Sequence, residues 1–301
     1  MSKRKGIDPG RTLAGLGLLL LGAAGCAGGE GSRRPEPLLP ADAALVKEAG
    51  RELMRDAPGW RATFHRMALD DRRLEEFTRI MAGLLVRRCA QGRIHPDSFG
   101  VFLAEDQALQ RYMRGLRAAG EAAAPPLLAI IRGGDSTARL LAAEAAGRLA
   151  EGTLGALRRA LAGGEPSHVA DACARALGWQ EGSGEALEAL LAAAGQEDFR
   201  VAGAALAALG RFGGPRARSR LLAVLEGEGD SFLRRQAALG IARLGEEEQV
   251  PVLLAYLEEM DEKGDEPGRA AAVRALRLLT NQALGEQPLV WRRWWASHRR
   301  R

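Results

Sequence analysis

The feature that most constrains the fold is an eleven-residue phrase that occurs five times between residues 124 and 280. Its starts, at residues 137, 168, 200, 235 and 270, are 31 to 35 residues apart, and an amphipathic segment precedes each copy. The copies are TARLLAAEAAG from Thr137, HVADACARALG from His168, RVAGAALAALG from Arg200, RQAALGIARLG from Arg235 and AAAVRALRLLT from Ala270. A period of this length predicts a stack of similar units, because one unit alone cannot cover its own apolar side.

The phrase has the pattern of a helix with one apolar side. Positions 2, 3, 6, 7 and 10 share a side at 3.6 residues per turn. In the third copy these are Val201, Ala202, Ala205, Leu206 and Leu209. We expect this side to be buried, with small residues that let neighbouring helices approach closely. The closing glycines, expected to adopt the left-handed conformation that ends a helix, are Gly147, Gly178, Gly210 and Gly245.

The phrase, with its Ala-Leu-Gly ending and a basic residue at or near its head, resembles the HEAT repeat, in particular the short variety also seen in bilin lyases. The resemblance covers residues 124–280 and implies an all-α fold, an α-solenoid of about five helical hairpins. Such repeats occur in scaffolds, adaptors and a few enzymes. The resemblance therefore implies an architecture without selecting an activity.

Residues 41–123 have helical periodicity but lack the phrase. Breaks at Pro58, Asp70 and Pro96 divide them into expected helices. The expected ranges are 41–56, 59–68, 72–91 and 97–119, with Asp97 or Ser98 as a cap of the last. We interpret this region as an N-terminal helical module, and degenerate repeats are the alternative.

The segment after the fifth phrase predicts a short closing helix over part of residues 281–301. Pro288 can begin a helix, and the three tryptophans that follow share one side of it: Trp291, Trp294 and Trp295. The ending resembles a Leu-Thr…Gly…Pro…Trp…Trp-Trp tail that closes some bacterial HEAT-repeat proteins. We expect the tryptophans to cap the open end of the solenoid, and an aromatic ligand site is the alternative. The arginines of the basic tail, Arg292 to Arg301, are expected to keep it soluble, or else to touch anionic lipid.

The first 25 residues have the pattern of an export signal. A basic start, Lys3 to Lys5, precedes an uncharged stretch, Leu13 to Ala24, that is too short to cross a bilayer. The following Ala23-Ala24-Gly25-Cys26 resembles the lipobox of bacterial lipoproteins, which implies lipidation of Cys26 and a tether over residues 26–40. Ala27 stands where an inner-membrane retention signal would be Asp. The resemblance thus implies a protein of the bacterial cell envelope, lipid-anchored at the outer membrane and facing the periplasm.

Charge and motifs exclude several classes of function. The formal net charge is +5, but most of the excess lies in the first 25 and last ten residues. The near-neutral body is a poor electrostatic match for nucleic acid. The sequence holds no catalytic motif, no histidine spacing for a metal and no cofactor fingerprint, so we expect no enzyme activity, metal or cofactor. Cys89 and Cys173 lie on apolar helix sides and are expected to be buried thiols.

The remaining candidate site is a groove lined by the five phrase helices. Positions 1, 4, 5 and 8 are expected to point into it, which includes Leu141, Glu144, Ala172 and Ala242. Its middle is small and apolar, and basic residues edge it. The candidate partner-binding residues are His168, Arg175, Arg200, Arg235, Arg269, Arg274 and Arg277. Arginine pairs bidentately with carboxylates, so an extended peptide or helix with acidic side chains is the expected partner.

These observations favour a membrane-anchored scaffold or adaptor that binds another polypeptide and does no covalent chemistry. Two alternatives stay open. One is a HEAT-type lyase or chaperone-like enzyme. The other is a module that binds envelope glycolipid or anionic lipid through its tryptophans and arginines.

Overall fold

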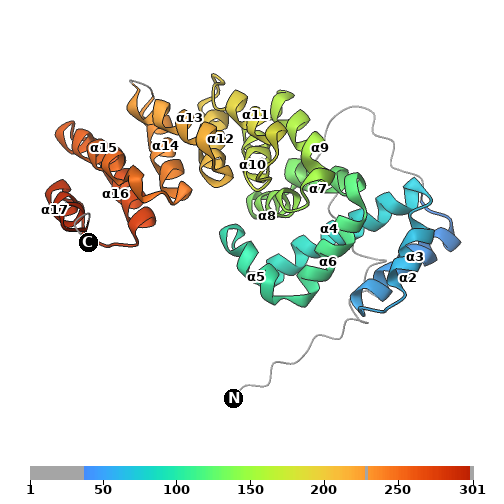
Figure 1. Cartoon of the computed structure of the whole chain (residues 1–301). Helices are drawn as coiled ribbons and strands as arrows, with labels where there is room; N and C mark the ends of the chain where they lie inside the picture. The colour runs from blue at the N-terminus through green and yellow to red at the C-terminus, as the bar shows by residue number, and fades with distance from the viewer. Residues whose placement is uncertain (1–36, 228–229, 299–301) are drawn as a thin grey trace, which may run out of the picture. The chain divides into compact units, whose positions relative to one another are not determined.

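The computed structural model describes residues 37–227 and 230–298, and throughout these ranges the chain is helical with no strand. The expected all-α class is therefore confirmed (Figure 1). The chain divides into two compact units, one ending at Ala142 and the other beginning at Ala143. The division falls inside α8 (Ser136–Gly147), the second helix of the first expected hairpin. The domain limits expected from the sequence stay predictions.

Unit 1 is a helical module built around one long helix, α4 (Asp71–Gln91). Around α4 pack α2 (Pro40–Met54), α6 (Gln107–Ala118), the 3-10 turn η3 (Gly120–Ala123) and α7 (Ala124–Gly133), while α3 (Trp60–Met67) packs on α2. The aromatic core includes Phe64 and Phe77, whose ring centroids are 5.4 Å apart in an edge-to-face arrangement. Unit 1 thus has an apolar core of its own.

The single helix expected over 97–119 is wrong, because the chain forms two helices there. A 3-10 turn, η2 (Pro96–Ser98), precedes α5 (Phe99–Glu105), and α6 follows after Asp106. The Asp106 carboxylate accepts hydrogen bonds from the backbone N–H groups of Ala108 and Leu109, which is an N-cap. Its other oxygen accepts from Arg88 of α4 at 2.9 Å. Side-chain capping from a distant partner overrides the continuous helical pattern.

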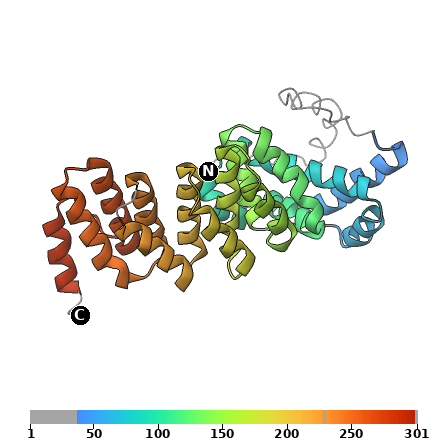
Figure 2. The same ribbon diagram turned by 90° about the horizontal axis from the view of Figure 1, so that it is seen from above.

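Unit 2 is an α-solenoid of helical hairpins in two layers (Figure 2). The second helices of the hairpins lie side by side in sequence order: α10 (Ser167–Leu177), α12 (Phe199–Phe212), α14 (Ser231–Leu244) and α16 (Glu266–Thr280). The first helices form the other layer: α9 (Glu151–Ala162), α11 (Gly184–Ala193), α13 (Pro215–Glu226) and α15 (Val250–Glu262). Each phrase copy forms the expected second helix.

The apolar side of the phrase is buried as expected. In α12, Ala202, Ala205, Leu206 and Leu209 are completely buried, and Val201 is 4% exposed. The two expected thiols are also buried and unbonded, and burial raises the pKa of Cys89 to about 12. The pattern of the phrase is therefore set by contacts on both flanks of each second helix.

The expectation that the closing glycines end helices is wrong for three of the four. Only Gly245 is left-handed, with φ +72°, whereas Gly178 is right-handed and Gly210 lies inside α12. These glycines lie where adjacent second helices touch. A Cβ added at Gly147 would come within 2.5 Å of the Ala176 carbonyl oxygen, and one at Gly210 would overlap the Gly240 backbone. Glycine is needed here for close helix approach, not for a turn.

Basic residues near the start of second helices link the two helices of a hairpin. Arg234 of α14 donates to the Leu225 carbonyl oxygen of α13 at 2.8 Å and bidentately to Glu259 of α15 at 2.7 and 2.6 Å. Arg139 likewise donates to the carbonyl oxygens of Ile131 and Gly134 at the end of α7. These arginines satisfy carbonyl groups that a helix end leaves open. The Arg234 hydrogen bond lowers the pKa of Glu259 to about 2.

The closing helix is α17 (Pro288–His298), which packs on α15. Trp291 is completely buried, and its Nε1 donates to the Gly285 carbonyl oxygen at 3.0 Å. Trp294 and Trp295 are only half-buried, and both stack on His298. Of the three expected capping residues, Trp291 alone is fully covered by the solenoid.

No helix in residues 37–227 and 230–298 combines the length and apolar character needed to cross a bilayer. The expected signal segment, the Cys26 lipidation site and Arg299 to Arg301 lie outside the described residues.

We predict that Gly210→Ala destabilises the protein, because the added Cβ would overlap the Gly240 backbone of α14. Overpacking of this kind costs on the order of 1–3 kcal/mol of unfolding free energy. The matched control is Gly155→Ala in α9, where the nearest atom to an added Cβ is the end of the Arg159 side chain at 3.4 Å. That change should be neutral, or stabilising by about 1 kcal/mol through helix propensity. Urea unfolding measures both, and equal stability of the two variants would contradict the role assigned to Gly210.

Candidate functional site

The layer of second helices in unit 2 presents a continuous outer surface, which we call the second-helix face. It comprises the exposed and half-buried side chains of α10, α12, α14 and α16. The expected partner-binding residues lie in these helices at different places. His168 and Arg200 are exposed and Arg235 is half-buried near the N-terminal ends, Arg175 is half-buried near the C-terminal end of α10, and Arg274 and Arg277 are exposed on α16. The prediction that they bind a partner stays a prediction.

An N-terminal row of basic and aromatic side chains crosses the starts of α10, α12 and α14. Phe199 is 51% exposed and makes an edge-to-face contact with Phe232, with centroids 5.7 Å apart. The guanidinium carbons of Arg200 and Arg235 lie 5.9 Å from the rings of Phe199 and Phe232 respectively. These four residues, with His168, form the row. It combines an exposed apolar patch with positive charge.

Arg269 differs from the other candidates, because acidic groups near the ends of α16 hold it. It pairs with Asp261 at 3.3 Å, with Glu266 at 3.4 Å and with Glu286 at 3.8 Å. These contacts join the end of α15, the start of α16 and the segment before α17. They give Arg269 a clear structural role.

A second basic cluster lies toward the C-terminal ends of α8, α10 and α12. We call it the Trp179 cluster, and its members are Glu144, Arg148, Arg175, Trp179 and Arg211. The guanidinium carbons of Arg148 and Arg211 lie 3.9 and 4.4 Å from the centroid of the Trp179 ring. Arg211 also donates to the Arg175 carbonyl oxygen at 3.2 Å. Three successive second helices therefore converge on one aromatic ring.

Glu144 is the carboxylate of the cluster, and only 1% of the residue is exposed. Its Oε2 accepts from Arg148 at 2.5 Å, and its Oε1 lies 3.8 Å from Arg175. Oε1 accepts no hydrogen bond from any residue that the structure describes. A buried carboxylate is costly unless it is paired, so Glu144 depends on these guanidinium groups.

Burial lowers the pKa of Arg211 to about 10. The nearby Glu144 carboxylate opposes this shift, whereas the positive charges of Arg175, Arg243 and Arg148 add to it. The guanidinium remains protonated at neutral pH, but its surroundings stabilise the charge less well than water does. This electrostatic environment favours the approach of an anion.

The structure corrects the expected lining of the groove. Leu141, Ala172, Glu144 and Ala242 were expected to point outward, but all are buried, at 0%, 0%, 1% and 3% exposure. Helical phase fixes the direction in which a side chain leaves the helix. It does not determine which neighbouring helix covers that side chain, so the same phrase position is buried in one hairpin and exposed in another.

The sequence analysis missed most of the Trp179 cluster. Arg148, Trp179 and Arg211 each directly follow a closing glycine, namely Gly147, Gly178 and Gly210. They lie just outside the eleven-residue phrase, where no helical side could be assigned to them. Comparing the residue after each glycine across copies would have found them.

In residues 37–227 and 230–298, no three side chains of His, Cys, Asp or Glu are grouped closely enough to hold a metal ion. The chemistry that the second-helix face offers is therefore charge, hydrogen bonding and aromatic contact.

Comparison with known families agrees with this architecture. A family model of HEAT repeats matches residues 187–277, which run from α11 into α16 and include three successive second helices. The chain therefore contains HEAT repeats, as the phrase predicted. A search of the curated proteins finds no significant match.

We predict that Glu144→Gln destabilises unit 2, because it removes the carboxylate that Arg148 and Arg175 surround. Breaking a buried ion pair costs about 3–5 kcal/mol. The matched control is Glu188→Gln, which breaks an exposed pair with Arg216 and should cost less than about 1 kcal/mol. Urea unfolding of both variants tests the difference. If Glu144→Gln is as stable as the control, Glu144 does not hold the cluster together.

Proposed function

We propose that this protein is a lipid-anchored interaction scaffold or adaptor of the bacterial cell envelope, which binds another polypeptide on its second-helix face and performs no covalent chemistry. The proposal rests on the HEAT repeats at residues 187–277, because repeats of this kind commonly act as protein-interaction scaffolds. The observation that carries it is the exposed basic and aromatic character of the second-helix face.

The chemistry of this face favours a partner with acidic side chains. The N-terminal row and the Trp179 cluster each place arginines beside aromatic rings. Between them on α12 lie the small residues Ala204 and Ala207, both half-buried. A main chain can approach such small residues closely, while arginines on either side pair with carboxylates.

The proposed address follows from the sequence of the first 40 residues. A diacylglycerol on Cys26, with acylation of the new N-terminus, would supply two or three acyl chains. One chain binds a membrane only marginally, but two or more give stable anchoring. The proposed location is the outer membrane, with the solenoid in the periplasm.

Photo-crosslinking in intact bacteria tests the binding face. A photoreactive amino acid at Ala204 or Ala207 should yield a discrete adduct with an envelope protein, and the same group at Ala223 on exposed α13 should not. The triple change of Arg200, Arg235 and Arg274 to Glu should abolish the adduct, because it reverses three charges on the face.

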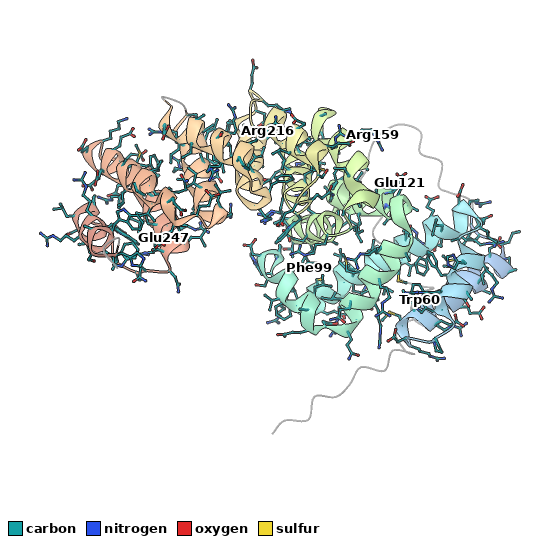
Figure 3. The ribbon with its side chains drawn as sticks, in the orientation of Figure 1. Trp60, Phe99, Glu121, Arg159, Arg216 and Glu247 are labelled. Atoms are coloured by element: carbon teal, nitrogen blue, oxygen red, sulfur yellow. The ribbon has the colours of Figure 1, made fainter. Side chains whose placement is uncertain are left out.

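The control for that variant changes Arg61, Arg159 and Arg216 to Glu, which alters the net charge equally. All three are exposed, and the last two project from the first-helix layer (Figure 3). It should keep the adduct. Adducts that survive the first triple change, or that form equally from Ala223, would show that the second-helix face is not the binding surface.

The anchor has a separate test. Metabolic labelling with an alkyne fatty acid should mark the wild-type protein and leave Cys26→Ser unlabelled, and only the wild type should fractionate with membranes. Cys173→Ser is the control, since that thiol is completely buried and should leave labelling unchanged. Labelling of Cys26→Ser at the wild-type level would refute the lipidation proposal.

A further inference from the structure

The Trp179 cluster contains an arginine whose charge is poorly compensated inside the protein. Arg211 is half-buried, and it contacts the Trp179 ring and the Arg175 carbonyl oxygen. In the part of the chain that the structure describes, no carboxylate oxygen lies within ion-pair distance of its guanidinium group. The nearby carboxylate, Glu144, is held at 2.5 Å by Arg148 instead. Arg211 therefore keeps hydrogen-bonding capacity that no described carboxylate uses.

We infer that Arg211 and Arg175, beside the ring of Trp179, form a binding site for a carboxylate side chain of an extended acidic polypeptide lying on the second-helix face. This inference rests on the proposed function, and it adds the chemical class of the partner and the residues that recognise it.

The cluster already shows the chemistry that the inference needs. Glu144 is a carboxylate bound by guanidinium groups of two successive second helices, Arg148 of α8 and Arg175 of α10. Arg211 continues the same arrangement on α12, one repeat further along. Contact with the Trp179 ring restricts the orientation of the Arg211 guanidinium, so less freedom is lost when a carboxylate binds.

The spacing of the two basic groups predicts the spacing of acidic residues in the partner. Arg200 and Arg211 are both on α12, eleven residues apart in the sequence. That separation corresponds to about 16 Å along the helix axis. An extended chain advances about 3.3 Å per residue, so acidic residues about five positions apart would reach both groups at once.

A direct binding measurement tests the site. The probe is a fluorescein-labelled peptide with glutamates five positions apart in a Gly-Ser-Thr background, and its counterpart has glutamine at the same positions. Fluorescence anisotropy with the full chain should show the glutamate peptide binding at least about tenfold more tightly than the glutamine peptide, since hydrogen bonds to charged groups contribute about 1.5–3 kcal/mol. Equal binding of the two peptides would overturn the inference.

Variants at Arg211 assign the binding to the cluster. Arg211→Met keeps an apolar stem against Trp179 and should weaken the glutamate peptide about tenfold. Arg211→Lys keeps the charge but not the planar fork, and should weaken it less. The control is Arg216→Met on α13, whose affinity should stay within about twofold of wild type. Wild-type affinity in a folded Arg211→Met protein would exclude the proposed site.

Two further measurements protect the test from misreading. Glutamate peptide should raise the unfolding temperature of wild type and of Arg211→Lys, and it should change the tryptophan emission of wild type but not of Trp179→Phe. Inorganic phosphate at the same concentration as the peptide should not displace it. Displacement by phosphate would indicate a general anion site and would contradict a carboxylate site.

The outcome is separable from that of the proposed function. If no envelope partner crosslinks to the second-helix face but the glutamate peptide binds through Arg211, the scaffold proposal fails and the site stands. If partners crosslink to the face while Arg211→Met binds the peptide normally, the scaffold stands and the site is wrong.

Discussion

The structure of unit 2 depends on how closely its second helices approach one another. Gly147 contacts α10, Gly178 contacts α12 and Gly210 contacts Gly240 of α14. Each contact is backbone against backbone or against a small side chain. Close approach buries the alanine-rich sides of these helices completely, which allows a core with few aromatic residues. The same small residues bring arginines from successive hairpins within reach of one another.

That convergence has an electrostatic consequence. A lone arginine on a solvent-exposed helix is fully hydrated, but in the Trp179 cluster Arg148, Arg175 and Arg211 share a partly dry volume with one buried carboxylate. The lowered pKa of Arg211 records the cost of this arrangement. On the other layer, ion pairs such as Arg216 with Glu188 and Arg218 with Glu246 join successive hairpins at exposed positions, where their contribution is small. The strained charges and the comfortable ones thus lie on different sides of the solenoid.

The repeat period allowed the sequence to predict the hairpins, the order of the second helices and the buried side of each. It also predicted that Cys89 and Cys173 are buried thiols and that Trp291 is covered. These predictions succeed because each depends on the local direction of a side chain from its own helix. They fail where another helix decides the outcome. Asp106 caps a new helix within an unbroken pattern, Glu144 is covered although its position in the phrase faces outward, and Arg269 is held by acidic residues near the ends of α16.

By itself, the sequence determined the helical class, the repeating hairpin and the export and lipidation pattern of the first 26 residues. Those features follow from periodicity and from short contiguous motifs. Only the tertiary structure revealed that three closing glycines serve helix contact and that Trp179, Arg148 and Arg211 meet around Glu144. These residues are about 30 positions apart in the chain, and stacking of successive repeats is what brings them together. The position of a residue within one repeat specifies its own direction, whereas a site shared between repeats depends on the distance and rotation from one repeat to the next.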